Sequence, residues 1–169
     1  LIYRDALGGI PQDYMAAAHW MALAGNQGHV PSMARLGWMY EKGQGVPRNL
    51  DEAVRWFHMA ADAGDATAAT HLGWLQETGA LGRADLAAAK VWYERGAVKD
   101  AAAQNNLGRI YREGLGVAPD FAKAQEWFQK AAAQNEPLAW FNLGLMAEQG
   151  QGMEKNEAEA MAWYRKAAE

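Results

Sequence analysis

The stretch SMARLGWMYEKGQGVPRNLDEAVRWFHMAADAGD, Ser32–Asp65, has the pattern of a helix, a glycine-marked turn and a second helix. The same pattern returns along the chain. A Leu-Gly pair recurs at spacings of 36, 35 and 36 residues, and a tryptophan of the second helix recurs at 36, 36, 35 and 36. The pairs begin at Leu36, Leu72, Leu107 and Leu143, and the tryptophans are Trp20, Trp56, Trp92, Trp127 and Trp163. Two markers with one period predict an all-α solenoid of antiparallel helix pairs.

The composition argues against several classes of protein. The 169 residues carry a formal net charge of −4 and show no basic stripe of the kind that nucleic-acid-binding proteins present. No unbroken apolar stretch is long enough to cross a membrane. The absence of cysteine excludes disulfides and thiolate metal sites, and it leaves the compartment open, either cytoplasmic or periplasmic.

Each second helix has a start signal at a fixed distance from its tryptophan. Seven residues earlier stands an aspartate or asparagine, whose side-chain oxygen can accept from the free amides of a first helical turn. These residues are Asp13, Asn49, Asp85, Asp120 and Asn156. We therefore expect second helices near 13–25, 50–63, 86–98, 121–134 and 157–168, and first helices near 32–42, 66–78, 102–113 and 138–149.

Stop signals recur as well. Gly28, Gly64, Asp100 and Asn135 are placed at one repeat position after the second helices, where they predict a left-handed backbone. Glycine pairs mark the turns inside the helix pairs. The second glycine is displaced by one residue in the turn 79–82, which predicts a differently shaped turn there.

The packing follows from the residues at fixed repeat positions. The glycine after each first-helix leucine costs about 1 kcal/mol of helix propensity. Its recurrence predicts a close approach between helices that a side chain would block. Each tryptophan is expected to fill the space between successive helix pairs.

These signals predict a single array, which we expect to be a segment of a longer protein. Leu1–Ala6 has the character of the end of a first helix, and Ile10-Pro11 aligns with Val46-Pro47 one repeat later. The predicted divisions are a partial repeat, 1–31, followed by repeats 32–65, 66–100, 101–136 and 137–169.

The third repeat has the fullest set of markers: Ala103, Leu107, Gly108, Tyr111, Gly114, Gly116, Val117, Ala124, Trp127, Ala131 and Ala132. This pattern resembles the Sel1-like repeat (SLR) family, a relative of the tetratricopeptide repeat, over nearly the whole chain. The resemblance implies a right-handed superhelix whose first helices line a concave surface. It also implies a non-catalytic scaffold, without a cofactor, that holds a protein or peptide. Gln76 and Ala147 depart from the family's tyrosine, which predicts looser repeats at those places.

The candidate binding surface follows from helical geometry. At about 100° per residue, Leu36 and Tyr40 face the packed side of their helix, whereas Trp38 points away from it. Aromatic and arginine side chains are frequent anchors of binding surfaces, and an arginine pair suits a carboxylate. The asparagines resemble those with which tetratricopeptide repeats grip a peptide backbone. The predicted contact residues are Arg35, Trp38, Lys42, His71, Trp74, Asn106, Arg109, Arg112, Asn142 and Leu145.

Alternatives remain open at this stage. Trp38 and Trp74 are also suited to packing against neighbouring first helices, and the arginines to pairing with Glu77 or Glu113. The segment could instead act as a spacer that binds partners through its convex face or edge. A hydrolase acting on cell-wall or glycan material is the third alternative. Its support is slight, because the four histidines and the single serine, Ser32, form no catalytic or metal-binding pattern.

Overall fold

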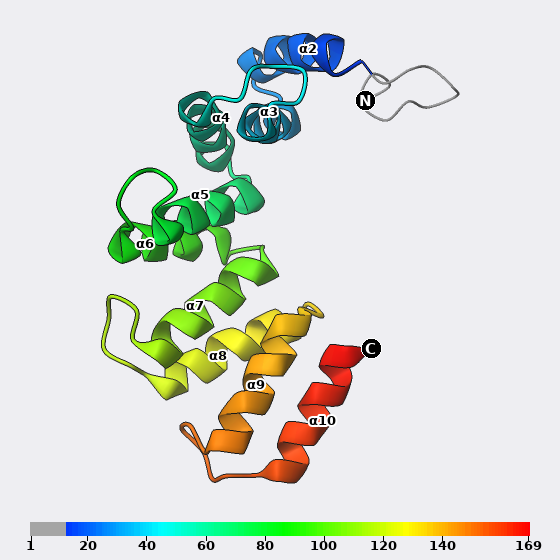
Figure 1. Cartoon of the computed structure of the whole chain (residues 1–169). Coiled ribbons are helices and arrows are strands. Elements are labelled where there is room, and N and C mark those ends of the chain that lie inside the picture. The colour runs from blue at the N-terminus through cyan, green and yellow to red at the C-terminus, as the bar shows by residue number, and fades with distance from the viewer. Residues whose placement is uncertain (1–12) are drawn as a thin grey trace. The chain divides into compact units, whose positions relative to one another are not determined.

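The computed structural model describes residues 13–169 and contains nine helices within that range (Figure 1). They are α2 (Tyr14–Asn26), α3 (Val30–Lys42), α4 (Leu50–Asp62), α5 (Ala66–Thr78), α6 (Leu86–Gly96), α7 (Ala101–Glu113), α8 (Phe121–Ala132), α9 (Pro137–Gln149) and α10 (Glu157–Ala168). First and second helices alternate as the sequence predicts, and no strand occurs among the described residues. The predictions for Leu1–Ala6 and Ile10-Pro11 fall outside this range.

The predicted N-caps of all five second helices are confirmed. Each Asp or Asn has an extended backbone, and its side-chain oxygen accepts from an amide of the first turn, for example Asn49 from Glu52 at 3.1 Å. The others are Asp13, Asp85, Asp120 and Asn156. The local chemistry of these five residues therefore fixes where the second helices begin.

The stop signals are confirmed at three positions and wrong at the fourth. Gly28, Gly64 and Asn135 have φ of 92°, 92° and 62°, whereas Asp100 has φ of −103° and caps the start of α7. The reason is a missing residue. Trp92 and Leu107 are one residue closer in sequence than the corresponding pairs in the other repeats. As a result α6 ends early, and Asp100 is the N-cap of α7 instead of the residue that ends α6.

The predicted close approach at the Leu-Gly pairs is confirmed in every repeat. A Cβ added to Gly37 would lie 2.7 Å from the ring of Phe57, and one added to Gly108 would lie 2.5 Å from the ring of Phe128. Tyr93 and Tyr164 cover the glycines of the other two repeats, Gly73 and Gly144, in the same way. An aromatic ring of the second helix thus rests directly on the backbone of the first.

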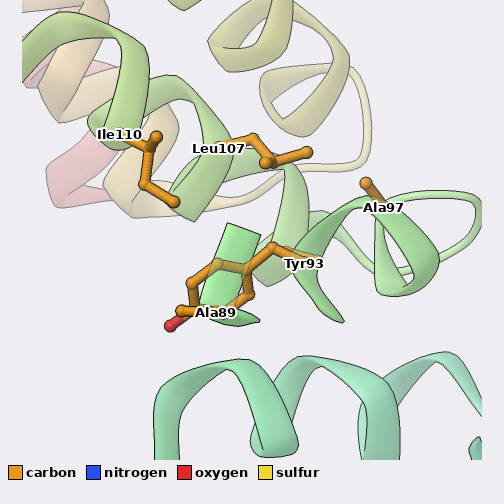
Figure 2. Close-up of a cluster of buried hydrophobic side chains, with 6 residues drawn as sticks. Ala89, Tyr93, Ala97, Leu107 and Ile110 are labelled. Carbon is orange, nitrogen blue, oxygen red and sulfur yellow. The ribbon is translucent and has the colours of Figure 1, made fainter. Parts of the chain in front are cut away.

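These contacts build small cores instead of one central core. In Figure 2, Tyr93 and Ala89 of α6 belong to one buried cluster with Leu107 and Ile110 of α7. Trp127 of the following helix pair packs against this cluster. Trp163 packs in the same manner against the cluster around Ala124, Phe128, Leu143 and Met146. Trp127 and Trp163 therefore fill the space between successive pairs, as predicted, and Trp56 is buried. The prediction is wrong for Trp20, which is 58 % exposed.

All four turns inside the helix pairs are closed by the same main-chain bond. The amide of the N-cap residue donates to the carbonyl at the family's tyrosine position: Asn49 to Tyr40, Asp85 to Gln76, Asp120 to Tyr111 and Asn156 to Ala147, over 2.8–2.9 Å. Gln76 and Ala147 therefore keep the closing bond although they lack the tyrosine. The turn at Gly79–Gly82 does differ in shape, since Gly82 has φ of 123° where Gly45, Gly116 and Gly152 have 70–73°.

The helices form two compact units, Leu1–Leu72 and Gly73–Glu169, which divide within α5. In the first unit α3 packs against α2 and α4. In the second, α7 packs against α6 and α8, and α9 packs against α8 and α10. None of the helices described here is long and apolar enough to span a membrane. The predicted contact residues divide between the units, and each set is considered within its own unit.

Candidate binding surface on the first helices

The outward positions of the first helices differ in exposure. The N-terminal unit holds Arg35, Trp38, Lys42 and His71, and the C-terminal unit holds Trp74, Asn106, Arg109, Arg112, Asn142 and Leu145. Lys42 and Trp74 are exposed, Asn142 is buried, and the others are half-buried. The prediction therefore selected side chains with quite different access to solvent.

In the N-terminal unit a buried acidic group joins α3 to α5. Glu41, which is 7 % exposed, lies with its Oε2 2.6 Å from His71 Nε2. Trp38 covers the histidine, with ring centroids 4.0 Å apart, and also contacts Phe57 edge-on. Lys42 donates to the other carboxylate oxygen of Glu41 at 2.9 Å. Trp38 thus packs against the neighbouring first helix, as one of the alternatives anticipated.

The burial of this pair alters both ionisation equilibria. Burial lowers the pKa of His71 below its usual value, and the nearby Glu41 carboxylate only partly reverses that effect. Burial by itself raises the pKa of Glu41, but hydrogen bonds from Lys42 and His71 outweigh it and bring the pKa below its usual value. The contact between α3 and α5 is therefore sensitive to acid.

In the C-terminal unit, Arg109 of α7 forms an ion pair with Glu77 of α5. The carboxylate of Glu77 also accepts from the hydroxyl of Tyr93 at 2.7 Å. Burial, followed by this hydrogen bond, raises the pKa of Tyr93. Tyr93, on a second helix, therefore fixes the Glu77 carboxylate, and Glu77 in turn fixes Arg109.

Arg112 of the same helix takes part in a second network. Its Nη1 donates to Asn142 Oδ1 at 2.7 Å, and the amide of Asn142 donates to Asn105 Oδ1 at 2.9 Å. The guanidinium lies 5.9 Å from the centre of the Phe128 ring. Asn142, predicted to grip a peptide, is 8 % exposed and directs both ends of its amide to protein partners. It joins α9 to α7.

One carboxylate contacts both arginines from the solvent side. Glu113 Oε1 lies 2.6 Å from Arg112 Nη2, and Glu113 Oε2 lies 3.7 Å from Arg109 Nη1. The Glu113 side chain is 38 % exposed, whereas Arg109 and Arg112 are 28 % and 13 % exposed. Pairing of the arginines with Glu77 and Glu113, the alternative drawn from the sequence, is the arrangement found. Trp74, 45 % exposed, is the large apolar side chain among the predicted contacts that most clearly faces solvent.

A cavity of about 840 Å³ lies on α2 and α3, lined by Trp20, His29, Ser32 and Arg35 among others. The Nε of Arg35 is buried and has no hydrogen-bond partner among residues 13–169. One repeat later the matching face, which includes Trp56 and Phe57, is 0–3 % exposed and packs against α3. In the next repeat, the position that corresponds to this cavity is therefore occupied by the first helix α3.

Sequence reasoning missed the residues that hold the predicted ones. The sequence pattern predicts no role for Asn105 and no hydrogen bond from the Tyr93 hydroxyl. A signal for the latter exists, because Glu77 precedes Tyr93 by 16 residues and Glu148 precedes Tyr164 by the same interval. Tyr164 donates to Glu148 at 2.9 Å, and burial followed by this bond raises the pKa of Tyr164 to about 12.

Among residues 13–169, no group of three or more His, Cys, Asp or Glu side chains is placed to hold a metal ion. The pairs Glu41–His71, Glu77–Arg109 and Arg112–Asn142 link successive first helices to one another. The surface therefore offers aromatic area, amide groups and paired charges, which are features of recognition.

The sequence matches the model of the Sel1 repeat over residues 1–29, 30–65, 66–97, 101–136 and 137–169. The chain belongs to the Sel1 repeat family. Sel1 repeat proteins are helical-repeat solenoids that generally serve as scaffolds for protein interactions and are generally not enzymes. The all-α repeat fold expected from the sequence is thereby confirmed.

Solved structures of bacterial Sel1 repeat proteins are similar to the chain. A Sel1 repeat protein from Oxalobacter formigenes is similar at 29 % identity and a TM-score of 0.91, over 99 % of this chain and 66 % of that one. A protective antigen present in uropathogenic Escherichia coli, which displays an SLR fold, is similar at 34 % identity and a TM-score of 0.91, over 99 % of this chain and 36 % of that one. The chain thus spans about two thirds and about one third of these relatives. None of the curated proteins compared with it is a match.

Proposed function

We propose that this Sel1 repeat segment is a non-catalytic scaffold that binds a peptide or protein segment along its first helices. The observation that supports the proposal most directly is the 45 % exposure of Trp74 on α5, at the repeat position that the partly exposed Arg109 occupies on the next first helix, α7. A tryptophan beside arginines is the composition that binding hot spots favour. The links that the half-buried Glu77 and the buried Asn142 make between first helices hold this face rigid, which lowers the entropic cost of binding.

The burial pattern identifies which substitutions can test the proposal. Charge reversal at Arg112 would leave Asn142 without its donor and place a carboxylate against the Phe128 ring, so the protein would also lose stability. Trp74 is half exposed, and its truncation should leave the fold intact. Trp20, 58 % exposed on second helix α2, provides a matched control.

The experiment is selection of peptides from a random library on the purified protein, followed by affinity measurement for the selected peptides. We expect Trp74→Ala to weaken binding at least tenfold, about 1.4 kcal/mol. Trp20→Ala should bind as the unaltered protein does, and both variants should keep their helical circular dichroism. Equal affinities for all three proteins would remove the first-helix face as the binding surface.

A second surface supports the alternative in which partners bind the second helices. In the C-terminal unit, three of these helices place a cation over their tryptophan: Arg95 over Trp92 at 4.5 Å, Lys130 over Trp127 at 4.1 Å and Lys166 over Trp163 at 4.8 Å. Such a row would suit an acidic partner surface. The test is the combined variant Arg95→Glu, Lys130→Glu, Lys166→Glu. If it no longer binds the selected peptides while Trp74→Ala still binds them, the second helices, and not the first helices, form the binding surface.

A further inference from the structure

Arg109 and Arg112 each have one fixed inner partner. Arg109 pairs with Glu77, which the Tyr93 hydroxyl anchors. Arg112 donates to Asn142, which Asn105 anchors in turn. Inner partners that are themselves held keep both guanidinium groups in place, so the arginines remain ordered whatever happens on their solvent side.

The solvent side of both arginines is occupied by a single group, the carboxylate of Glu113. It is more exposed than either arginine, and it follows Arg112 directly in the sequence at the last position of α7. Its contact with Arg112 is short, at 2.6 Å, and its contact with Arg109 is loose, at 3.7 Å. Tyr93 anchors Glu77, whereas within residues 13–169 the hydrogen bond and ion pairs of Glu113 go to the two arginines.

We infer that Glu113 is an internal competitor that occupies a carboxylate-binding site formed by Arg109 and Arg112. The inference rests on the proposed function, and it specifies the chemistry of the ligand. A peptide carboxylate, from a C-terminus or an acidic side chain, displaces Glu113 and takes over its hydrogen bonds to the arginines. Glu113 then turns toward water, where its desolvation cost is relieved. The two inner networks stay as they are.

Displacement lowers apparent affinity, because the ligand must first break an internal pair. Exposed ion pairs of this kind contribute modestly to stability, so removing the competitor should tighten carboxylate binding about threefold to fivefold. The variant is Glu113→Gln, which keeps the shape and removes the charge. Glu126→Gln, at an exposed position of α8 in the same unit, is the control for the change in net charge.

Three small probes distinguish the sources of the carboxylate. N-acetyl-glycylglycine carries only a C-terminal carboxylate. The α-amide of N-acetylglutamic acid carries only a side-chain carboxylate, and N-acetyl-glycylglycine amide carries none. The readout is the ¹H–¹⁵N shift of the Nε–H groups of Arg109 and Arg112 in the full chain. We expect both carboxylate probes to shift these signals, and the neutral amide to leave them unchanged.

Tighter binding to Glu113→Gln than to Glu126→Gln, with either carboxylate probe, supports the inference and identifies the source. Equal binding to the two variants, or no carboxylate-dependent shift in Glu113→Gln, overturns it. Neither result depends on Trp74. Selected peptides that need Trp74 but no carboxylate would therefore uphold the proposed function and remove only this inference. A Glu113 effect without any Trp74 effect would uphold the carboxylate site on α7 and remove Trp74 from the binding surface.

Discussion

The two units join successive first helices through the same repeat positions but with different chemistry. Glu41 and Arg112 occupy one position, and their partners His71 and Asn142 occupy another. In the N-terminal unit the link is a titratable acid–imidazole pair beneath a tryptophan. In the C-terminal unit it is a hydrogen bond from an arginine guanidinium to an amide oxygen. Repeat position thus decides which residues meet, and residue type decides how the contact responds to its surroundings.

The largest expected effect tests what the two units share. Alanine at Gly37 or Gly108 would place a methyl group 2.5–2.7 Å from the ring of a phenylalanine that is itself fully buried. We expect each substitution to lower the free energy of unfolding by about 2–3 kcal/mol, measured by urea denaturation. Phe128→Leu added to Gly108→Ala should recover part of the loss. A tolerated alanine in one unit alone would show that the two units are not packed alike.

The next effect isolates the amide link of the C-terminal unit. Asn142→Ala removes the partner of Arg112 and of Asn105 at a buried site, which should cost about 1–3 kcal/mol of stability. Asn106→Ala, at the equivalent position one repeat earlier, is the matched control, since Asn106 is half-buried and Glu77 pairs instead with Arg109. Equal costs would mean that the Arg112–Asn142 contact adds nothing beyond packing.

The smallest effect concerns pH and should appear in the N-terminal unit. Folding lowers the pKa of His71 from its usual value of 6.5 and that of Glu41 from 4.5. A lowered pKa means that the unfolded chain binds more protons, so the stability is present above these usual values and is lost as pH falls. Melting temperature should therefore decline below about pH 6.5. His71→Gln should flatten the decline between pH 6.5 and 5, and an NMR titration midpoint of His71 at or above 6.5 would contradict the account.

The repeat period, the helix bounds and the five N-caps follow from the sequence because each depends on residues close together in the chain. The Leu-Gly packing follows too, since a recurring glycine in a helix implies a close neighbour. The prediction for Asp100 is wrong because its repeat position is counted from Trp92, and one residue is missing between Trp92 and Leu107. The state of the binding face was harder to predict. Helical geometry selects Arg109 and Asn142 as outward residues, but their partners lie on other helices, 32 and 37 residues away in sequence.

The main-chain bond that closes each hairpin has a consequence for how such proteins change. Because its donor and acceptor are backbone atoms, the bond does not depend on the side chain at the acceptor position, which is Tyr40, Gln76, Tyr111 or Ala147. Substitutions there can accumulate without opening the turn. The residue at this position of each helix pair can therefore change during evolution while the spacing between the two helices stays constant. A duplicated helix pair can be added to the array with its turn closed by the same main-chain bond.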